Sequence, residues 1–374
     1  MSKVYFSTAR TLRWDYRHSI AGKLETLLGH LDLDQRLTKD DSVAVKTHWG
    51  SHGAFRIVPP SFIRKINNAV TKTGAKPFVT DTVRIMGLDY LEVANQNGLN
   101  HLSCGAPVVL ADGLYGKDNM LVEAGPLLGS LAVASAIYDA PAMVVCSHIK
   151  GHINAGYAGA IKNLAMGCVS SRHREQGWQK GRGAMHCHGE MGIEWNQEIC
   201  TFCEQCRDIC PLHSIEFKDS TFTYDSEECW HCGRCTRVCQ EGALTLPQDD
   251  ETFQKSMAEA AAAVLSTFDR RKVLYVNVLV QIQPECDCMP VADVPVIQDQ
   301  GIMVSDDLAS IEQASLDMLR AAPPLPQSAA EEAGIKPGDD VMFKLNPRPM
   351  QIQIDEAERL GLGTKNYELV TINP

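Results

Sequence analysis

Eight of the fourteen cysteines in this 374-residue chain lie within forty residues, from Cys200 to Cys239. They form two runs with the pattern C-x2-C-x2-C-x3-C, CTFCEQCRDICP and CWHCGRCTRVCQ, and the second run begins twenty-nine residues after the first. A cubane of four irons and four sulfides needs four thiolates at tetrahedral corners, and one such loop supplies three of them. The doubled run therefore predicts two 4Fe-4S clusters.

The last cysteine of each run is expected to cross to the other cluster, as in bacterial two-cluster ferredoxins. The first cluster is then assigned to Cys200, Cys203, Cys206 and Cys239. The second is assigned to Cys210, Cys229, Cys232 and Cys235. Pro211 turns the chain away after the first run, whereas the second run has Gln240 at that place. Structural zinc on paired C-x2-C knuckles is one alternative, but the last cysteine of each run would then ligate no metal. A disulfide scaffold is a second alternative.

A second group of candidate ligands lies outside the repeat. Cys286 and Cys288 flank Asp287 just after an apolar run, and such a pair can bind one soft metal ion through both sulfurs. Buried, unreactive cysteines are the alternative. Histidines gather in segments expected at strand ends or in a long loop, namely His48, His52, His148, His152, His173, His186 and His188. They suggest a metal or proton-transfer site, although exposed loop histidines would explain any one of them.

Lys150 and Lys162 flank the small-residue run 151–161, where a ligand could approach the backbone closely. The basic residues Arg172, Arg174, Lys180 and Arg182 follow. Together they could hold a carboxylate or phosphate, or they could belong to a solvated loop. We select His48, His152 and Lys162 as candidate catalytic residues and Cys286 and Cys288 as ligands of an additional metal ion. Neither a dinucleotide-binding glycine motif nor a Walker A sequence is present, so neither NAD nor ATP is indicated.

The composition narrows the class of protein. A formal charge of −11 argues against nucleic-acid binding, which needs a concentrated basic face. The first eighteen residues lack a secretion signal and no segment has eighteen uninterrupted apolar residues, so we expect no membrane association and a cytoplasmic location. So many cysteines in a reducing compartment indicate metal or redox chemistry, and oxygen-sensitive cubanes favour an anaerobic host.

Apolar patterns predict strands that alternate with helices, and hence an α/β fold with a mostly parallel sheet flanked by helices. Strands are expected at 4–7, 42–47, 76–80, 107–111, 142–147 and 272–282. Helices are expected at 20–31, 59–73, 88–97, 130–137, 252–268 and from Ser305, as the capping residue, to about 320. Ligands of such sheets bind beyond the carboxyl ends of the strands, where Thr47–Gly50, Asp81–Thr82 and Ser147–Lys150 are expected. Segment 151–192 is expected to be loops packed over the site.

The pattern divides the chain into four parts. An α/β domain occupies 1–192 and resumes at 247–327, a ferredoxin-like domain of 193–246 is inserted in it, and an appendage follows at 328–374. The inserted part has ten acidic and four basic residues, a formal −6. This charge would attract a positively charged redox partner protein, or it would simply solvate a small domain. Oligomeric state has no signal in the sequence.

The combined pattern resembles the domain-of-unknown-function family numbered 362, in which an α/β domain often carries an inserted two-cluster ferredoxin. The resemblance rests on KTHWGSHG at 46–53, GHINAGYAGAIKNLAMGC at 151–168, the segment 286–315 that begins CDCMPVADVP, and the cysteine repeat. It implies an electron-transfer iron–sulfur protein. The α/β part is also similar to nickel-pincer lactate racemases at His48, His152, Tyr157 and Lys162, which implies a ligand pocket.

The leading hypothesis is an iron–sulfur oxidoreductase that passes electrons through two 4Fe-4S clusters to a metal or a small anionic substrate in the α/β domain. A non-catalytic electron carrier or cluster-delivery protein that docks a partner enzyme is the second hypothesis. A metal-cofactor isomerase of the lactate-racemase type is the third.

Overall fold

The computed structural model describes residues 1–186, 192–210, 212–226, 228–247, 249–288 and 292–373. Cys187, His188 and Pro211, which the sequence singled out, lie outside these ranges. Within the ranges, none of the helices combines the length and apolar character needed to cross a membrane.

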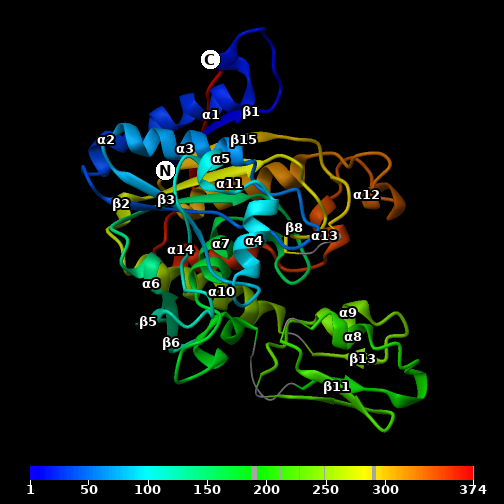
Figure 1. The fold of residues 1–374 in the computed structure, drawn as a ribbon. Helices are drawn as coiled ribbons and strands as arrows, with labels where there is room; N and C mark the ends of the chain where they lie inside the picture. Colours follow the sequence, from blue (N-terminus) through cyan, green and yellow to red (C-terminus); the bar gives the residue numbers. More distant parts are fainter. Residues whose placement is uncertain (187–191, 211, 227, 248, 289–291, 374) are drawn as a thin grey trace.

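An eight-stranded sheet forms the centre of the larger lobe (Figure 1). Its strands, in spatial order, are β16 (Tyr367–Thr371), β1 (Ser2–Thr8), β15 (Gly301–Ser305), β14 (Val273–Leu279), β7 (Ala142–His148), β2 (Ser42–Lys46), β3 (Lys76–Asp81) and β4 (Val108–Leu110). β15 runs antiparallel to β1 and β14, and all other neighbouring pairs are parallel. The predicted α/β class with a mostly parallel sheet is confirmed.

Helices cover both faces of this sheet because its strands are apolar on both sides. On β2, Val43 and Val45 face one core and Ala44 faces the other. The first core includes residues of α1 (Ile20–Leu28), α3 (Pro60–Lys72) and α4 (Asp89–Gln96). The second core includes residues of α7 (Ala160–Cys168), α10 (Asp250–Leu265), α11 (Leu308–Ala321) and α14 (Gln351–Arg359). The body is therefore a three-layer sandwich of helices, sheet and helices.

Shorter elements complete the body. Two antiparallel pairs lie outside the main sheet, β5 (Asn119–Glu123) with β6 (Ser130–Ala134) and β8 (Lys150–His152) with β9 (Gly156–Ala158). The short helices are α2 (Leu33–Arg36), α5 (His101–Cys104), α6 (Ser135–Tyr138), α12 (Ala329–Glu332) and α13 (Val341–Leu345).

The cysteine-rich segment forms a smaller lobe at one side of the body (Figure 1). It contains β10 (Glu194–Trp195) paired with β13 (Leu244–Thr245), β11 (Ile215–Lys218) paired with β12 (Thr221–Tyr224), and the helices α8 (Gln205–Asp208) and α9 (Arg234–Val238). Its small core of Ile215, Phe222, Leu244 and two cysteines is separate from the two cores of the body. We call residues 193–246 the cysteine-rich lobe.

Three local predictions were wrong. Segment 130–137 is strand β6 followed by the single turn α6, because a short apolar run that is buried on all sides carries no readable period. Segment 151–192 contains the β8–β9 hairpin and helix α7, whose burial over most of its surface hides its helical period. Ser305 ends β15, and the side chain of Asp307 instead caps α11 by accepting from Ser310 N at 2.9 Å.

The C-terminal segment, expected as an appendage, contributes to the layers of the body. β16 pairs in parallel with β1 and so extends the main sheet. α14 packs against α10 and α11. Near the site, the side chain of Asn346 donates to Pro284 O at 3.0 Å, and Arg348 Nε donates to Ile153 O at 3.1 Å.

Glu312 on α11 holds the start of α7 in place. Its fully buried carboxylate accepts from Ala160 N at 2.7 Å and Ile161 N at 3.3 Å, the first two residues of α7. Tyr157 Oη and Asn277 Nδ2 also donate to it, at 3.1 and 3.0 Å. The negative charge lies at the positive end of the helix dipole, so this one side chain joins α11 and α7 to β14 of the main sheet and to β9.

We predict that Glu312→Ala lowers the free energy of unfolding by about 3 kcal/mol, because it leaves several buried donors without an acceptor. Thermal and denaturant unfolding of the purified protein measure the loss. Glu251→Ala, at an exposed position of α10, is the matched control, and the salt bridge of Glu251 to Lys255 should contribute less than about 0.5 kcal/mol. Equal effects of the two substitutions would contradict the role given to Glu312.

Candidate functional site

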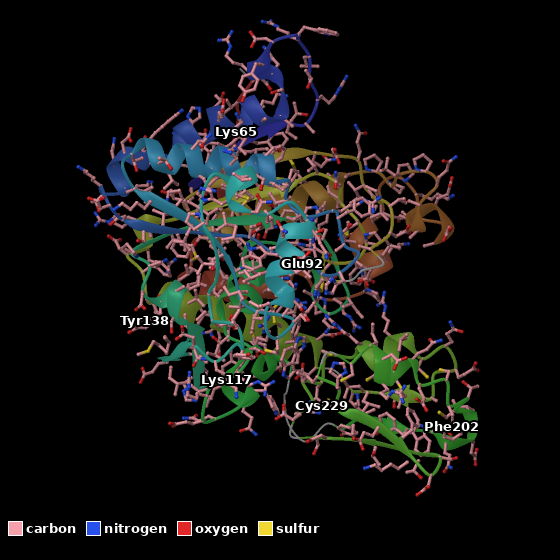
Figure 2. All side chains as sticks on the ribbon, viewed as in Figure 1. Lys65, Glu92, Lys117, Tyr138, Phe202 and Cys229 are labelled. Carbon is pink, nitrogen blue, oxygen red and sulfur yellow. A yellow bond between two sulfur atoms is a disulfide. The ribbon has the colours of Figure 1, made fainter. Side chains whose placement is uncertain are left out.

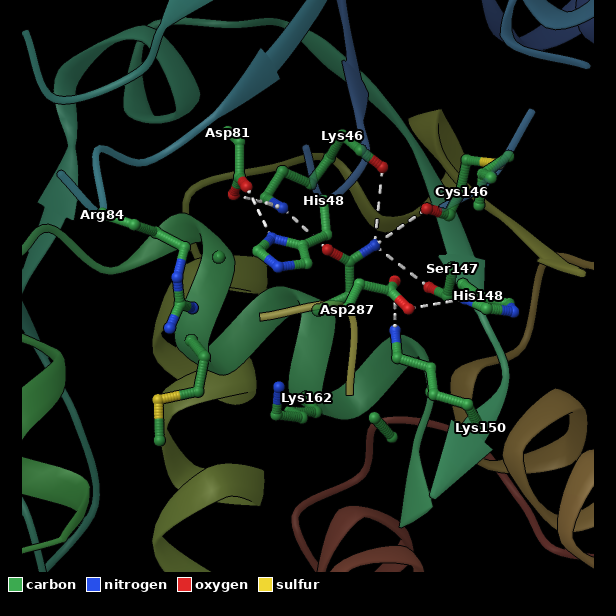
Figure 3. A pocket seen from close by; sticks show the side chains of 16 residues that line it. Lys46, His48, Asp81, Arg84, Cys146, Ser147, His148, Lys150, Lys162 and Asp287 are labelled. Carbon is green, nitrogen blue, oxygen red and sulfur yellow. Dashed lines mark hydrogen bonds and ion pairs between the residues drawn. The ribbon is translucent and has the colours of Figure 1, made fainter. Parts of the chain in front are cut away.

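A pocket opens at the carboxyl ends of β2, β3 and β7, where the sheet rule places ligands (Figure 3). The start of α7 and the loop after β14 close its other sides. Its polar lining consists of Lys46, His48, Asp81, Arg84, Ser147, His148, Lys150, Lys162, Asn163 and Asp287. All three polar runs expected at strand ends thus contribute side chains to one pocket.

Asp81, at the end of β3, orients His48. His48 Nδ1 lies 2.9 Å from Asp81 Oδ2, and Tyr90 Oη donates to the same oxygen at 2.7 Å. Lys46 Nζ lies 2.9 Å from Asp81 Oδ1. Burial opposes ionisation of Asp81, but the charge of Lys46 and the hydrogen bond with His48 outweigh it and hold the pKa of this carboxyl below its ordinary value. The carboxylate therefore requires a proton on Nδ1 of His48.

His48 is a neutral ring with a free lone pair. Burial lowers the pKa of its imidazole to about 4 even though Asp81 acts in the other direction. With the proton on Nδ1, Nε2 is left as an acceptor, and this buried atom has no hydrogen-bond partner among the described residues. Nε2 can therefore take a proton from a bound molecule or ligate a metal ion.

Lys162 and Arg84 provide positive charge that no carboxylate of the described chain neutralises by an ion pair. Lys162 extends from α7 into the pocket (Figure 3). Burial, followed by repulsion from Lys150 and Arg84, holds the pKa of its amine well below the ordinary value. By contrast, Lys46 is paired with Asp81 and Lys150 with Asp287, at 2.9 and 2.8 Å. The pocket thus has an excess of cations over anions.

Asp287 is a fully buried carboxylate on the opposite wall. His148 Nδ1 and Gln283 Nε2 lie 2.9 and 2.8 Å from its Oδ1, and Lys150 Nζ lies 2.8 Å from its Oδ2. Burial would raise the pKa of Asp287, but His148 and Lys150 more than compensate and lower it. The three partners come from β7, β8 and the loop after β14, so Asp287 fixes the position of its own loop.

The sulfurs of Cys286 and Cys288, on either side of Asp287, form a disulfide in the structure. A ligand atom of His152 lies within 4.8 Å of both sulfurs. Nδ1 of His152 accepts from Asn154 N and Ala155 N at 3.2 and 3.0 Å, and burial, followed by nearby cations, holds the pKa of its imidazole well below its ordinary value. His152 does not line the pocket of His48 and Lys162, so the three candidate catalytic residues are divided between two adjacent places.

In the cysteine-rich lobe, each of two cavities brings together one of the assigned cysteine sets. One is lined by Cys200, Cys203, Cys206 and Cys239, and the other by Cys210, Cys229, Cys232 and Cys235. Burial, followed by the neighbouring thiols Cys232 and Cys229, raises the pKa of Cys235 to about 12. Such crowded thiols become thiolates readily only beside a metal cation, so the donor sets fit iron–sulfur clusters.

The second of these sets lies against the body. Asn154 Nδ2 donates to the backbone carbonyl of Cys232 at 3.1 Å, and Arg237 Nη2 lies 2.5 Å from Glu285 Oε1. Arg234, which lines the cavity of this set, has its pKa lowered by burial and then by Arg84 of the pocket. In Figure 2, Cys229 lies at the side of the lobe nearer the body, and Phe202 lies at the far end.

Other residues chosen from the sequence lie elsewhere. His52 is exposed, and His173 accepts from Glu175 N and Gln176 N within its own turn. Arg182 is buried, donates to Val83 O and stacks over Trp230, so it joins the lobe to the body instead of facing the pocket. Arg84 was missed, because one arginine after a strand has no distinctive spacing in the sequence.

The chain is similar to known proteins over parts of its length. A model described as "Domain of unknown function (DUF362)" matches residues 43–317. The chain belongs to the DUF362 family. The matched range contains every lining residue of the pocket and both cysteine sets.

Two curated relatives of this DUF362 chain are ferredoxins or ferredoxin-like. An uncharacterized ferredoxin of Methanocaldococcus jannaschii is 37% identical over 62 residues, which are 15% of this chain and 41% of that protein. A ferredoxin-like protein in the vnf region of Azotobacter vinelandii is 34% identical over 56 residues, 14% of this chain and 86% of that protein. The chain thus spans about two fifths of the first relative, and the similarity is limited to a segment about as long as the cysteine-rich lobe.

Two solved structures match part of this chain with low TM-scores. The lactate racemase apoprotein from Thermoanaerobacterium thermosaccharolyticum has 12% sequence identity and a TM-score of 0.34, over 75% of this chain and 51% of that chain. A protein from Thermotoga maritima has 10% identity and a TM-score of 0.38, over 70% of this chain and 50% of that chain.

We predict that Lys162 is acylated by acetic anhydride at pH 8 faster than surface lysines such as Lys117. A lowered pKa leaves a larger fraction of the amine neutral at a given pH, and only the neutral amine reacts. Competitive labelling followed by peptide mass spectrometry measures both rates in one sample.

Arg84→Met should slow the labelling of Lys162, because removing a neighbouring positive charge raises the pKa of the amine. Arg17→Met, at an exposed site, is the matched control and should leave the rate unchanged. A rate for Lys162 that does not respond to Arg84→Met would contradict the electrostatic account of the pocket.

Proposed function

We propose that this protein is an iron–sulfur oxidoreductase that exchanges electrons with a small anionic substrate bound in the pocket of His48 and Lys162. Two cysteine sets with ferredoxin spacing, a ferredoxin-like segment and a cation-rich pocket support this proposal. A cytoplasmic location fits it, since eleven of the described cysteines are free of disulfides.

The cysteine sets would hold the redox cofactors. Cys200, Cys203, Cys206 and Cys239 would ligate one 4Fe-4S cluster, and Cys210, Cys229, Cys232 and Cys235 would ligate the other. When bound, each cluster supplies transfer of a single electron. The residues of the chain supply the remaining functions, which are binding of the substrate, proton transfer and exclusion of water.

The observation that carries the proposal is the contact of the cysteine-rich lobe, at its second cysteine set, with the hairpin and the loop that carry the pocket residues Lys150 and Asp287. Cys232 is bonded through its carbonyl to Asn154, and Glu285, beside the Cys286–Cys288 loop, is paired with Arg237 of the lobe. A carrier that merely displayed its clusters to partners would not need one set packed against a polar pocket. The arrangement favours electron transfer within this chain over the simple carrier.

The pocket is suited to an anion that gains or loses protons. Arg84 can offer paired hydrogen bonds to a carboxylate or phosphate, and the amine of Lys162 can offer a further one. Neutral His48, oriented by Asp81, can accept a proton at Nε2 or return it. Binding of an anion would also raise the pKa of Lys162, because the anion would place a negative charge beside the amine.

A redox partner protein would dock at the far end of the cysteine-rich lobe. Cys203 of the first set is exposed, and Ile199 and Phe202 beside it are 45% and 38% exposed. The lobe carries a formal charge of −6, so a partner with a positive patch around its own redox centre would be attracted to it.

We predict about eight irons and eight sulfides per chain in protein purified without oxygen. Elemental and sulfide analysis with electron paramagnetic resonance of the reduced protein measures the clusters. Cys206→Ser should remove signals of one cluster, whereas Cys104→Ser, a buried cysteine outside both sets, should leave all iron in place. Protein that contains two zinc ions and no sulfide would contradict the proposal. Protein that contains one nickel ion and catalyses no net redox reaction would favour an isomerase instead.

We also predict that small carboxylates or phosphate raise the melting temperature of the cluster-containing protein, measured with acetate, succinate and phosphate as probes. Arg84→Met should weaken this binding by about tenfold, the loss expected for one charge-assisted hydrogen bond. Lys117→Met, at an exposed position, is the control for a general loss of charge. Equal stabilisation by an uncharged amide such as acetamide would contradict anion recognition.

A further inference from the structure

The loop of Cys286 and Cys288 lies between the two functional parts of the chain. Asp287, in the middle of the loop, lines the pocket and pairs with His148 and Lys150. Glu285, one residue before the loop, pairs with Arg237 of the cysteine-rich lobe at 2.5 Å. Electrons that pass between the lobe and the pocket thus have this loop along their route.

The β8–β9 hairpin makes a second connection at the same place. Gly151 N donates to Gln283 O at 2.9 Å, and a Cβ on Gly151 would lie only 2.0 Å from Pro284 O, so the hairpin packs directly on the segment between β14 and the loop. His152 follows and lies against the two sulfurs. Asn154 then bonds to the carbonyl of Cys232. One hairpin therefore contacts both the disulfide and a ligand of the nearer cysteine set.

A stabilising role does not account for this disulfide. The bonded cysteines are two residues apart in the sequence, so the bond closes a very short loop and constrains the unfolded chain little. The loop is already held by the ion pairs and hydrogen bond of Asp287. The other eleven described cysteines form no disulfide, which is typical of a compartment where structural disulfides are not maintained.

We propose that Cys286 and Cys288 form a redox-active thiol–disulfide pair that holds two electrons between the cysteine-rich lobe and the pocket. This inference rests on the proposed function and names an internal electron acceptor for it. On reduction, the S–S bond breaks, and each sulfur gains one electron and one proton from solvent to become a thiol. The two electrons come one at a time from low-potential donors of the iron–sulfur class. On oxidation, the two electrons and two protons leave and the S–S bond forms again.

Thiol counting on the cluster-containing protein tests the inference. The oxidised protein is photoreduced with a deazaflavin in the absence of oxygen, quenched in acid with denaturant, and alkylated with iodoacetamide. Mass spectrometry of the peptide with Cys286 and Cys288 then reports their state. We expect neither cysteine to be alkylated before photoreduction and both after it, a gain of two thiols per chain. Chain stripped of iron by a chelator should show no such gain under the same illumination.

Variants separate the pair from the clusters. Cys286→Ser and Cys288→Ser should each abolish the two-thiol gain while leaving iron, sulfide and the reduced-cluster spectrum unchanged. Cys104→Ser is the matched control and should keep both the clusters and the gain.

Three outcomes would overturn the inference: full alkylation of both cysteines before photoreduction, release of one further metal ion per wild-type chain that either serine variant lacks, or an equal thiol gain in iron-free chain. Each of these can occur with all eight irons present and reducible, in which case the proposed function stands and only the thiol–disulfide pair is rejected. Absence of iron and sulfide would instead reject the proposed function itself.

Discussion

The buried carboxylate of Asp287 is the interaction on which the site depends. A charge so far from water persists only if cations and donors surround it, and His148, Lys150 and Gln283 do so at 2.8 to 2.9 Å. These partners tie the loop after β14 to β7 and β8, which lie beside it in the fold. Because Cys286 and Cys288 are the neighbours of Asp287 in the chain, the same ion pairs set the position of both sulfurs. The pocket residue Asp287 and the neighbouring residues that face the cysteine-rich lobe thus form a single structural unit.

Asp81 plays the corresponding part on the other side of the pocket. It neutralises Lys46 and orients His48, so that the acceptor atom Nε2 of His48 is kept free of a proton. Asp81 and Asp287 are already paired with other side chains, so Lys162 and Arg84 form no ion pair with a carboxylate of the described chain. The anionic substrate that we propose would therefore complete the electrostatic balance of the pocket. Proton transfer at His48 would then take place close to the groups proposed to store electrons, which are the Cys286–Cys288 pair and the clusters.

Much of the fold was predictable because its signals are local. The strands at β2, β3, β7 and β14 and the helices α1, α3 and α10 are long enough for their apolar period to be read. Helix α7 was missed since it is buried over most of its surface, and β6 was mistaken for a helix since it is short and apolar. The C-terminal segment could not be placed from the sequence. β16 pairs with β1 at the opposite end of the chain, and neither strand has a local pattern that indicates its partner.

The sequence alone determined the two cysteine sets, the α/β class and the candidates His48 and Lys162. The proposed cluster ligands follow from spacing, because a single loop must wrap a cubane. The strand-end residues follow from the rule that ligands bind at the carboxyl ends of parallel strands. Only the tertiary structure decided that Arg84 and Asp287 line the same pocket as His48 and Lys162. It also decided that His152 lies beside Cys286 and Cys288, and that the second cysteine set lies against the hairpin that contains His152. These relations depend on the order of strands in the sheet and on how the lobe docks, since ion pairs between buried groups form across segments that local sequence patterns do not connect.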